Sequence, residues 1–276
     1  MTEDAGYLLA NAQAEAGVRF GALASLFDPP TFRHLRGLGL GAGWRCWEVG
    51  AGGRSVPRWL AYQVGPAGRV LATDIDVSWM TADDQPDDTV DETADDAAGY
   101  EVARHDVGAE PPPAEIFDLV HARLVLVHVP NRDAALRAMV SVVRPGGWLL
   151  LEDADPALQP LSCPDEYGPE QRLANHLRRG FRSLLAQRGA DLAYGRTLPR
   201  LLRAAGLVDV RADAFFPIAS PACVQLERAT VAQIRARLVA NGLATEEDIK
   251  QHLANLDDGR LDPTPAPMIS AWGRKP

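Results

Sequence analysis

The stretch "WEVGAGGRSVPRWLA", residues 47–61, decides the fold because it joins a short apolar run, a glycine-rich turn and a helical pattern. A strand, a glycine turn and a helix start together present backbone N–H groups and the positive end of a helix to an anion. Glycine is needed in such a turn, since a Cβ would block the close approach of a ligand. Gly50, Gly52 and Gly53 are present here, so the stretch predicts a loop that holds a nucleotide-like cofactor.

The loop departs from the dinucleotide-binding fingerprint, G-x-G-x-x-G. That fingerprint requires a glycine where this chain has Ser55. Asp74, at the end of the next apolar run, strengthens the interpretation as a cofactor loop, because an acid there accepts hydrogen bonds from ribose hydroxyls. These residues alone do not separate a nicotinamide cofactor from another adenosine cofactor.

Apolar runs of strand length alternate with segments of helical period. Near-continuous apolar character is typical of strands that are buried on both faces, as in a parallel sheet. The predicted strands are 44–49, 69–74, 100–104, 117–122 and 147–153. Between them, apolar side chains recur at helical spacing over 56–64 and 136–143, and "RPGG" (144–147) predicts a turn before the fifth strand. This order predicts an α/β, doubly wound sheet.

The pattern changes after residue 153. A proline-rich connection is followed by a predicted helix over 173–185, a short helix over 198–207, a strand over 208–216 and a last strand in "PMISAWGRKP". Two more helices are predicted from capping signatures, one at Thr230 with Gln233 and one at Thr245 with Asp248. Residues 5–36 are predicted to be mainly helical.

The acidity of the chain is concentrated in one segment. Residues 83–96 contain eight carboxylates and no Lys or Arg, so the rest of the chain carries only −1 of the net charge of −9. Such a block predicts a solvated insertion, and its spacing is not that of a calcium loop. The chain has no basic stripe of the kind that grips phosphate backbones, so nucleic acid is not an expected partner.

Cysteine usage and hydropathy indicate a cytoplasmic location. Cys46, Cys163 and Cys223 are far apart and odd in number, which argues against a disulfide framework or a zinc site. No run approaches the roughly 18 apolar residues that span a membrane. The first residues also lack a basic region followed by an apolar stretch. We therefore expect neither a membrane partner nor a secretory signal.

Several motifs in a fixed order carry a family resemblance: "EVGAGG" (48–53), "ATDID" (72–76), "RHDV" (104–107), the segment 117–153 and the terminal "AWGRKP". On these motifs the chain resembles bacterial class I S-adenosylmethionine-dependent methyltransferases of the small-molecule type, strongly over 5–153 and loosely beyond. The resemblance implies a Rossmann-like, doubly wound seven-stranded sheet whose last strand is antiparallel. It also implies three regions: a helical N-terminal cap (1–40), a cofactor-binding core (41–153), and lid helices with the final two strands of the same sheet (154–276).

The resemblance implies which positions contact S-adenosylmethionine. These are Glu48, Gly50, Ala51, Gly52, Asp74, Ile75, Asp106, Val107, His121 and Ala122. Glu48 would hold the loop, while Gly50 and Gly52 would approach the methionine part. Asp74 would take the ribose, and Ile75 would lie against the adenine.

The remaining expected contacts lie farther along the chain. Asp106 and Val107 would reach the adenine amino edge. The backbone of His121 and Ala122 would lie beside the cofactor's ammonium group. Simpler alternatives stay open: Asp106 as a helix cap or turn residue, and Ile75 as a core residue.

Arg54 departs from the family pattern, which usually has a small residue there. Three alternatives stay open. The side chain is solvated, or it makes a charge-assisted contact to the cofactor carboxylate, or it fills the pocket and abolishes binding.

His121 is the expected catalytic residue. Methyl transfer from a sulfonium is an in-line displacement that proximity and alignment accelerate, and an O- or N-acceptor also needs a base. Histidine titrates near neutral pH, and His121 stands at the end of a predicted strand, where sites of this fold lie. A role through its backbone alone is the alternative.

The sequence does not identify the methyl acceptor. Expected substrate residues are Tyr7, Arg123, Asp153 and Arg196. Arg196 as a helix cap and Tyr7 as a packing residue are the alternatives. No metal is expected, because a magnesium site at Asp153 and Asp155 would also want a carboxylate in place of His121.

The sequence therefore predicts methyl transfer to an O, N or C atom of a small organic molecule, with a role in secondary metabolism. The alternative is a non-methylating protein of the same fold, a cyclase or binding protein with an altered cofactor loop. Ser55, "RHDV" and "RPGG" disfavour a nicotinamide dehydrogenase. The apolar stripe of Leu226, Ile234 and Leu238 is more typical of core than of pocket wall, and the amphipathic cap and lid could support a homodimer.

Overall fold

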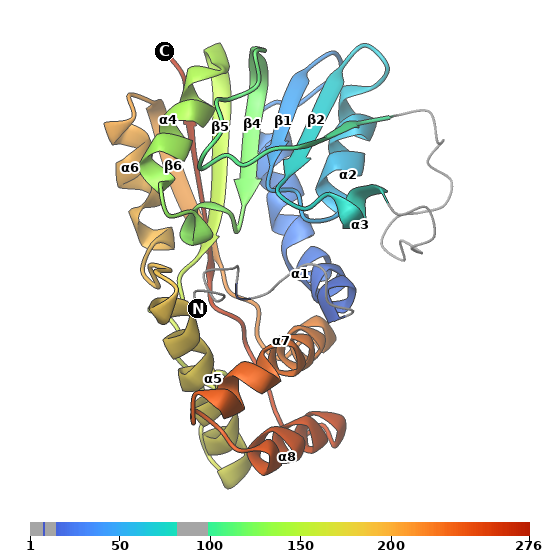
Figure 1. Cartoon of the computed structure of the whole chain (residues 1–276). Helices are drawn as coiled ribbons and strands as arrows, with labels where there is room; N and C mark the ends of the chain where they lie inside the picture. The colour runs from blue at the N-terminus through green and yellow to red at the C-terminus, as the bar shows by residue number, and fades with distance from the viewer. Residues whose placement is uncertain (1–7, 9–14, 82–98) are drawn as a thin grey trace.

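The computed structural model describes residue 8 and residues 15–81 and 99–276. Tyr7 and the acidic segment 83–96 lie outside the described residues, so what the sequence predicts for them stays a prediction. Figure 1 shows a central sheet with helices on both faces and a further group of helices beyond one end of its strands.

One sheet contains every strand of the described residues. The strands are β1 (Arg45–Val49), β2 (Arg69–Asp74), β3 (Glu101–Arg104), β4 (Phe117–Arg123), β5 (Val143–Ala154), β6 (Val208–Phe215) and β7 (Met268–Arg274). Their order is β3-β2-β1-β4-β5-β7-β6, and neighbours run parallel except where β7 pairs with β5 and β6. The prediction of a Rossmann-like seven-stranded sheet with an antiparallel last strand is confirmed.

The helices form two layers on the sheet and a third group beside it. They are α1 (Glu15–Gly37), α2 (Ser55–Val64), α3 (Ser78–Thr81), α4 (Arg132–Ser141), α5 (Pro169–Gln187), α6 (Leu198–Ala204), α7 (Pro221–Ala240) and α8 (Glu246–Asp257), with short 3₁₀ turns η1 (Leu126–His128) and η2 (Gly195–Thr197). In Figure 1, α4 and α6 lie in front of the sheet, whereas α1 and α2 lie behind it. The helices α5, α7 and α8 gather below.

Both faces of the sheet are buried, which explains the continuous apolar runs of its strands. Successive strand side chains point to opposite faces. Leu119 on β4 therefore packs with Leu35 of α1 and Leu60 of α2, whereas its neighbour Val120 joins the cluster that contains Met139 of α4.

Two boundaries differ from the sequence predictions. Thr245 and Asp248 do form a capping box at the start of α8, but Thr230 lies inside α7, whose N-cap is Ser220. β5 begins at Val143, so "RPGG" interrupts this strand instead of preceding it. The interruption appears as a register shift in the pairing of β4 with β5.

The carboxyl ends of β1, β2 and β4 point toward the helices α5, α7 and α8 (Figure 1). Ligands of open α/β sheets bind at this end of the strands. Among the described residues, none of the helices has the length and apolar character needed to cross a membrane. The division of the chain at residues 40 and 153 stays a prediction.

Candidate functional site

The glycine loop after β1 takes a backbone conformation that favours glycine. Gly50 and Gly52 both have a φ of +63°, in the left-handed region. A Cβ at Gly50 would lie 2.4 Å from Cγ2 of Val125, and one at Gly52 would lie 2.9 Å from Cε1 of Phe20 on α1. A Cβ at Gly53 would meet nothing within 4 Å. Glycine is therefore required at two positions of the loop by both backbone and neighbours.

Asp74 ends β2, and its carboxylate holds the loop. Oδ2 accepts the N–H of Gly52 at 2.9 Å, and Oδ1 accepts the N–H of Asp76 at 3.0 Å. Burial raises the pKa of Asp74, while these backbone donors oppose the rise. A carboxylate has about four acceptor positions, so Asp74 retains capacity for a hydroxyl group. Ile75 beside it is 54% exposed and leaves an apolar surface uncovered.

Arg54 has a partner within the protein that none of the three sequence alternatives included. Its Nε donates to the backbone carbonyl of Met80, in α3, at 3.2 Å. The N–H of Ala51 donates to the carbonyl of Thr73 on β2 at 3.0 Å. Both hydrogen bonds tie the glycine loop to β2 and the segment after it.

Asp106 shapes the turn after β3. Its Oδ1 accepts the N–H of Gly108 at 2.9 Å, and its own N–H donates to Oε2 of Glu110 at 3.1 Å. Asp106 is thus a turn residue in this structure. Val107 and Ala122 are both buried in the core on the α4 side of the sheet. Contacts of these residues to a cofactor stay predictions.

His121 lies inside the protein with both ring nitrogens engaged. Its side chain is fully buried, with Nδ1 2.6 Å from Oε2 of Glu48 and Nε2 3.3 Å from Oε2 of Glu152. Burial by itself would lower the pKa of His121, but the two carboxylates outweigh it and raise the pKa to about 9. The ring is therefore a cation at neutral pH and has no free nitrogen to accept a proton. This geometry does not favour a general base at His121, and that role stays a prediction.

A buried polar network continues from this histidine to α1. Glu152 accepts hydrogen bonds from the hydroxyls of Thr31 on α1 and Ser270 on β7. Arg123 donates to Oγ1 of Thr31 at 3.1 Å, and its guanidinium lies 2.8 Å from Oδ1 of Asp28. The network fastens α1 to the strands of the sheet. Arg123, which the sequence predicts to contact the substrate, is part of this network.

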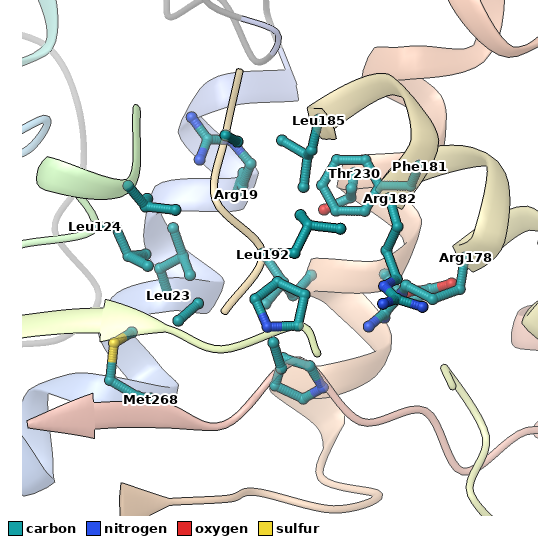
Figure 2. A pocket seen from close by; sticks show the side chains of 18 of the residues that line it. Arg19, Leu23, Leu124, Arg178, Phe181, Arg182, Leu185, Leu192, Thr230 and Met268 are labelled. Carbon is teal, nitrogen blue, oxygen red and sulfur yellow. The ribbon is translucent and has the colours of Figure 1, made fainter. Parts of the chain in front are cut away.

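A pocket lies where β4 and β5 end, between the sheet and the helices α1, α5 and α7 (Figure 2). It encloses about 1020 Å³ of empty space, counted out to its open mouth. Its wall is mainly apolar, with Leu23 and Phe27 from α1, Phe181 and Leu185 from α5, and Leu226 from α7. A mainly apolar wall with a few charged groups is typical of small-molecule sites.

Charged groups stand on two sides of this pocket. Figure 2 shows Arg178 and Arg182 of α5 on one side and Arg19 of α1 on the other. Arg178 pairs with Glu227 of α7 at 2.7 Å, and Nε2 of the buried His252 lies 3.3 Å from the same carboxylate. Burial would raise the pKa of Glu227, but Arg178 and His252 hold it well below its usual range. Glu227 is therefore ionised and neutralises Arg178.

The segment after β4 lies beside both the glycine loop and the pocket. Val125 packs against Gly50, so closely that no Cβ fits between them, while Leu124, Val127 and His128 line the pocket. Leu124 has a φ of +58°, a strained value for a residue with a side chain. One short segment therefore contacts both places.

His128 is the histidine with access to the pocket. Burial lowers its pKa to about 4, and the charges of Arg19 and Arg132 add to this effect. The ring is therefore neutral at pH 7, in contrast to the cationic His121.

Asp153 and Arg196, the other predicted substrate residues within the described part of the chain, act behind the pocket wall. Asp153 is buried, and burial raises its pKa well above the usual value, although the backbone N–H groups of Val127 and Leu126 oppose the rise. Arg196 forms a bidentate pair with Asp155, at 2.7 and 2.6 Å. Neither Asp153 nor Arg196 is among the residues that line the pocket.

The sequence does not predict the charged residues of the pocket. These are Arg19, Arg178, Arg182, Glu227 and His128. An arginine on an amphipathic helix is a weak signal, because its long stem covers apolar surface at many positions. The predicted apolar stripe of α7 divides: Leu226 lines the pocket, whereas Ile234 and Leu238 pack in the core of the helical group. Within the described residues, no group of three His, Cys, Asp or Glu side chains is placed to hold a metal ion.

Comparison with known proteins identifies relatives by sequence. A family model described as a methyltransferase domain matches residues 21–212. Methyltransferase str2 of Strobilurus tenacellus is 39% identical over 101 residues, which are 34% of this chain and 34% of that protein. The ubiquinone/menaquinone biosynthesis C-methyltransferase UbiE of Chromobacterium violaceum is 31% identical over 124 residues, 45% of this chain and 48% of that protein. Each alignment thus spans less than half of the relative's length.

Solved structures share the fold at low sequence identity. Phosphoethanolamine N-methyltransferase 2 of Haemonchus contortus, in complex with phosphomonomethylethanolamine and S-adenosylhomocysteine, superimposes with a TM-score of 0.56 at 14% identity, covering 98% of this chain and 59% of that one. A methyltransferase assigned to an antibiotic biosynthesis pathway in Anabaena variabilis also gives a TM-score of 0.56, at 15% identity. The superposition covers 89% of this chain and 96% of that one. Both comparisons support the fold.

Proposed function

The chain belongs to the methyltransferase-domain family, and we propose that it is an S-adenosylmethionine-dependent methyltransferase whose acceptor is a small organic molecule. The observation that carries this proposal is the position of the segment after β4. Val125 packs on the glycine loop, and Leu124 and His128 line the pocket. A cofactor on the loop and an acceptor in the pocket would therefore both lie next to the same short segment, and a direct transfer requires such proximity.

The residues around the loop fit S-adenosylmethionine. Gly50 and Gly52 present backbone without a Cβ, which suits the methionine part. Asp74 retains acceptor capacity for the ribose, and the exposed Ile75 offers an apolar surface to the adenine. When bound, S-adenosylmethionine supplies an electrophilic methyl group on its sulfonium. The chain's own residues bind and align it.

His128 replaces His121 as the candidate general base. It lines the pocket, and its lowered pKa keeps the ring neutral at pH 7, so that it is able to accept a proton from an acceptor. Replacing His128 with Gln should therefore lower turnover while leaving the affinity for S-adenosylhomocysteine unchanged. The choice among O-, N- and C-methylation, a role in secondary metabolism, a cytoplasmic location and a homodimer stay predictions from the sequence.

Calorimetric titration with S-adenosylhomocysteine, S-adenosylmethionine and NAD tests the cofactor. We expect the first two to bind and NAD to show no binding. Asp74→Ala should weaken the binding of S-adenosylhomocysteine at least about tenfold, which corresponds to the roughly 1.4 kcal/mol of one charge-assisted hydrogen bond. Unchanged affinity in Asp74→Ala, or binding of NAD alone, would refute the proposed cofactor site.

A matched pair of glycine variants separates the cofactor loop from general stability. Gly50→Ala puts a Cβ against Val125 at a left-handed φ, so we expect loss of binding. Gly53→Ala meets open space and should bind S-adenosylhomocysteine as the native protein does. Thermal unfolding of both variants shows whether each is folded before the titration.

A further inference from the structure

The pocket has an apolar body with a charged end. Leu23 of α1 faces Phe181 of α5 across it, and Leu192 and Met268 complete the wall (Figure 2). A ligand that fills this space must present apolar surface over most of its length, because an unpaired polar group would lose its hydrogen bonds with water.

Within the described part of the chain, Arg182 is the cation at this end that has no ion-pair partner. Its Nε is buried and has no hydrogen-bond partner, and no ion pair of its guanidinium occurs within the described residues. Figure 2 shows Arg182 extending from α5 toward the end of the pocket that Arg178 also occupies. Arg178 differs from Arg182 because it pairs with Glu227 at 2.7 Å.

The charges that line the pocket do not balance. At the end of the pocket formed by α5, two arginines, Arg178 and Arg182, face a single carboxylate, that of Glu227, and the neutral His128 adds no charge. Arginine does not lose its proton in proteins, so the excess is permanent. A guanidinium whose buried Nε has no hydrogen-bond partner is unfavourable, and an anion placed beside it offsets that cost.

From this arrangement, and on the basis of the proposed function, we propose that the methyl acceptor is a carboxylic acid with an apolar body, whose carboxylate pairs with Arg182. The planar guanidinium matches a carboxylate with two parallel hydrogen bonds. One unpaired guanidinium in a mainly apolar wall suits a monoanion. A phosphate monoester would bring a second charge to the same single partner.

The test is calorimetric titration of the full chain with octanoate, octanol and octyl phosphate, each with and without saturating S-adenosylhomocysteine. We expect octanoate to bind at least tenfold more tightly than octanol and more tightly than octyl phosphate. Arg182→Met keeps the length of the apolar stem and removes the charge, and it should abolish the preference for octanoate over octanol. Arg179→Met makes the same change at an exposed position of the same helix and should retain the preference.

Every outcome of this titration either supports or overturns the proposal. Equal affinity for octanoate and octanol, no binding of either, tighter binding of octyl phosphate, or a preference that survives in Arg182→Met would overturn it. Binding of S-adenosylhomocysteine is measured separately in every variant. A native protein that binds the cofactor but does not prefer the carboxylate refutes this inference alone, whereas failure to bind the cofactor refutes the proposed function.

Discussion

The imidazole of His121 is a buried cation held between two carboxylates, and this makes it a stabilising residue. Glu48 on β1 and Glu152 on β5 contact its two nitrogens at 2.6 and 3.3 Å. Removing the cation leaves two buried carboxylates on neighbouring strands, and breaking such a pair typically costs about 3–5 kcal/mol. Because the folded-state pKa is about 9, above the unfolded value of about 6.5, the contribution is complete below pH 6.5 and is lost as the pH rises through 9.

We predict that His121→Gln lowers the free energy of unfolding by about 3 kcal/mol at pH 6. The deficit should shrink as the pH rises from 6.5 to above 9, because the native histidine then loses its charge. Urea unfolding at several pH values measures this difference. His176→Gln, at an exposed position of α5, is the control and should show little change. A deficit that does not vary with pH would contradict a stabilising role of the charge.

The contrast between His121 and His128 shows why the protonation state of a histidine cannot be predicted from a single sequence. The partners of His121 come from strands 73 and 31 residues away in the chain, so nothing near it predicts a cation. His128, seven positions later, lies beside Arg19 and Arg132 and has its pKa lowered to about 4. Both residues lie near the carboxyl end of β4, the region where the sequence predicts a base. Only the three-dimensional contacts separate the two.

At the scale of elements, α1 is fastened to the sheet by its polar face. Arg123 of β4 pairs with Asp28 at 2.8 Å and donates to Thr31, three residues along the same helix face. Asp28 is buried, so loss of Arg123 would leave its charge without this partner. Such an ion pair differs from that of Arg144 with Asp118, whose side chains are 43% and 19% exposed.

We predict that Arg123→Met destabilises the protein by about 3–5 kcal/mol, whereas Arg144→Met costs less than about 1 kcal/mol. Hydrogen exchange should accelerate in α1 more than in α2, because the lost contact joins only α1 to the strands. Adding Asp28→Asn to Arg123→Met should restore part of the stability by removing the unpaired charge. Equal acceleration in every helix would show that this contact does not hold α1 specifically.

Elements with local signals were predictable from the sequence, and their exceptions have local causes. The predicted capping box of Thr245 and Asp248 is confirmed, because a helix, α8, does begin at this point. The similar pattern at Thr230 fails because Ser220 with Pro221 already starts the helix ten residues earlier. A four-residue signature cannot tell the start of a helix from its interior.

For the whole molecule, the glycine loop could be predicted but the pocket could not. The loop is one continuous stretch, and its glycines are required by backbone conformation, a property that sequence displays directly. The pocket takes its walls from α1, α5, α7 and the ends of β4 and β5, segments separated by most of the chain. Their meeting depends on how the sheet orders its strands, so the lining residues carry no local pattern.

The helix α1 contacts both the glycine loop and the pocket, and this gives a last prediction. Phe20 contacts the loop at Gly52, while Leu23 and Phe27 of the same helix line the pocket. Binding of S-adenosylhomocysteine should therefore slow hydrogen exchange in α1 and in the segment 124–128, and it should leave α8, which contributes no lining residue, nearly unchanged. At one hundred times its dissociation constant, the ligand should raise the free energy of unfolding by about 2.7 kcal/mol. Urea unfolding with and without ligand, together with exchange measured by mass spectrometry, checks both parts. Protection of α8 equal to that of α1 would mean that the ligand acts on the fold as a whole and that α1 has no special role.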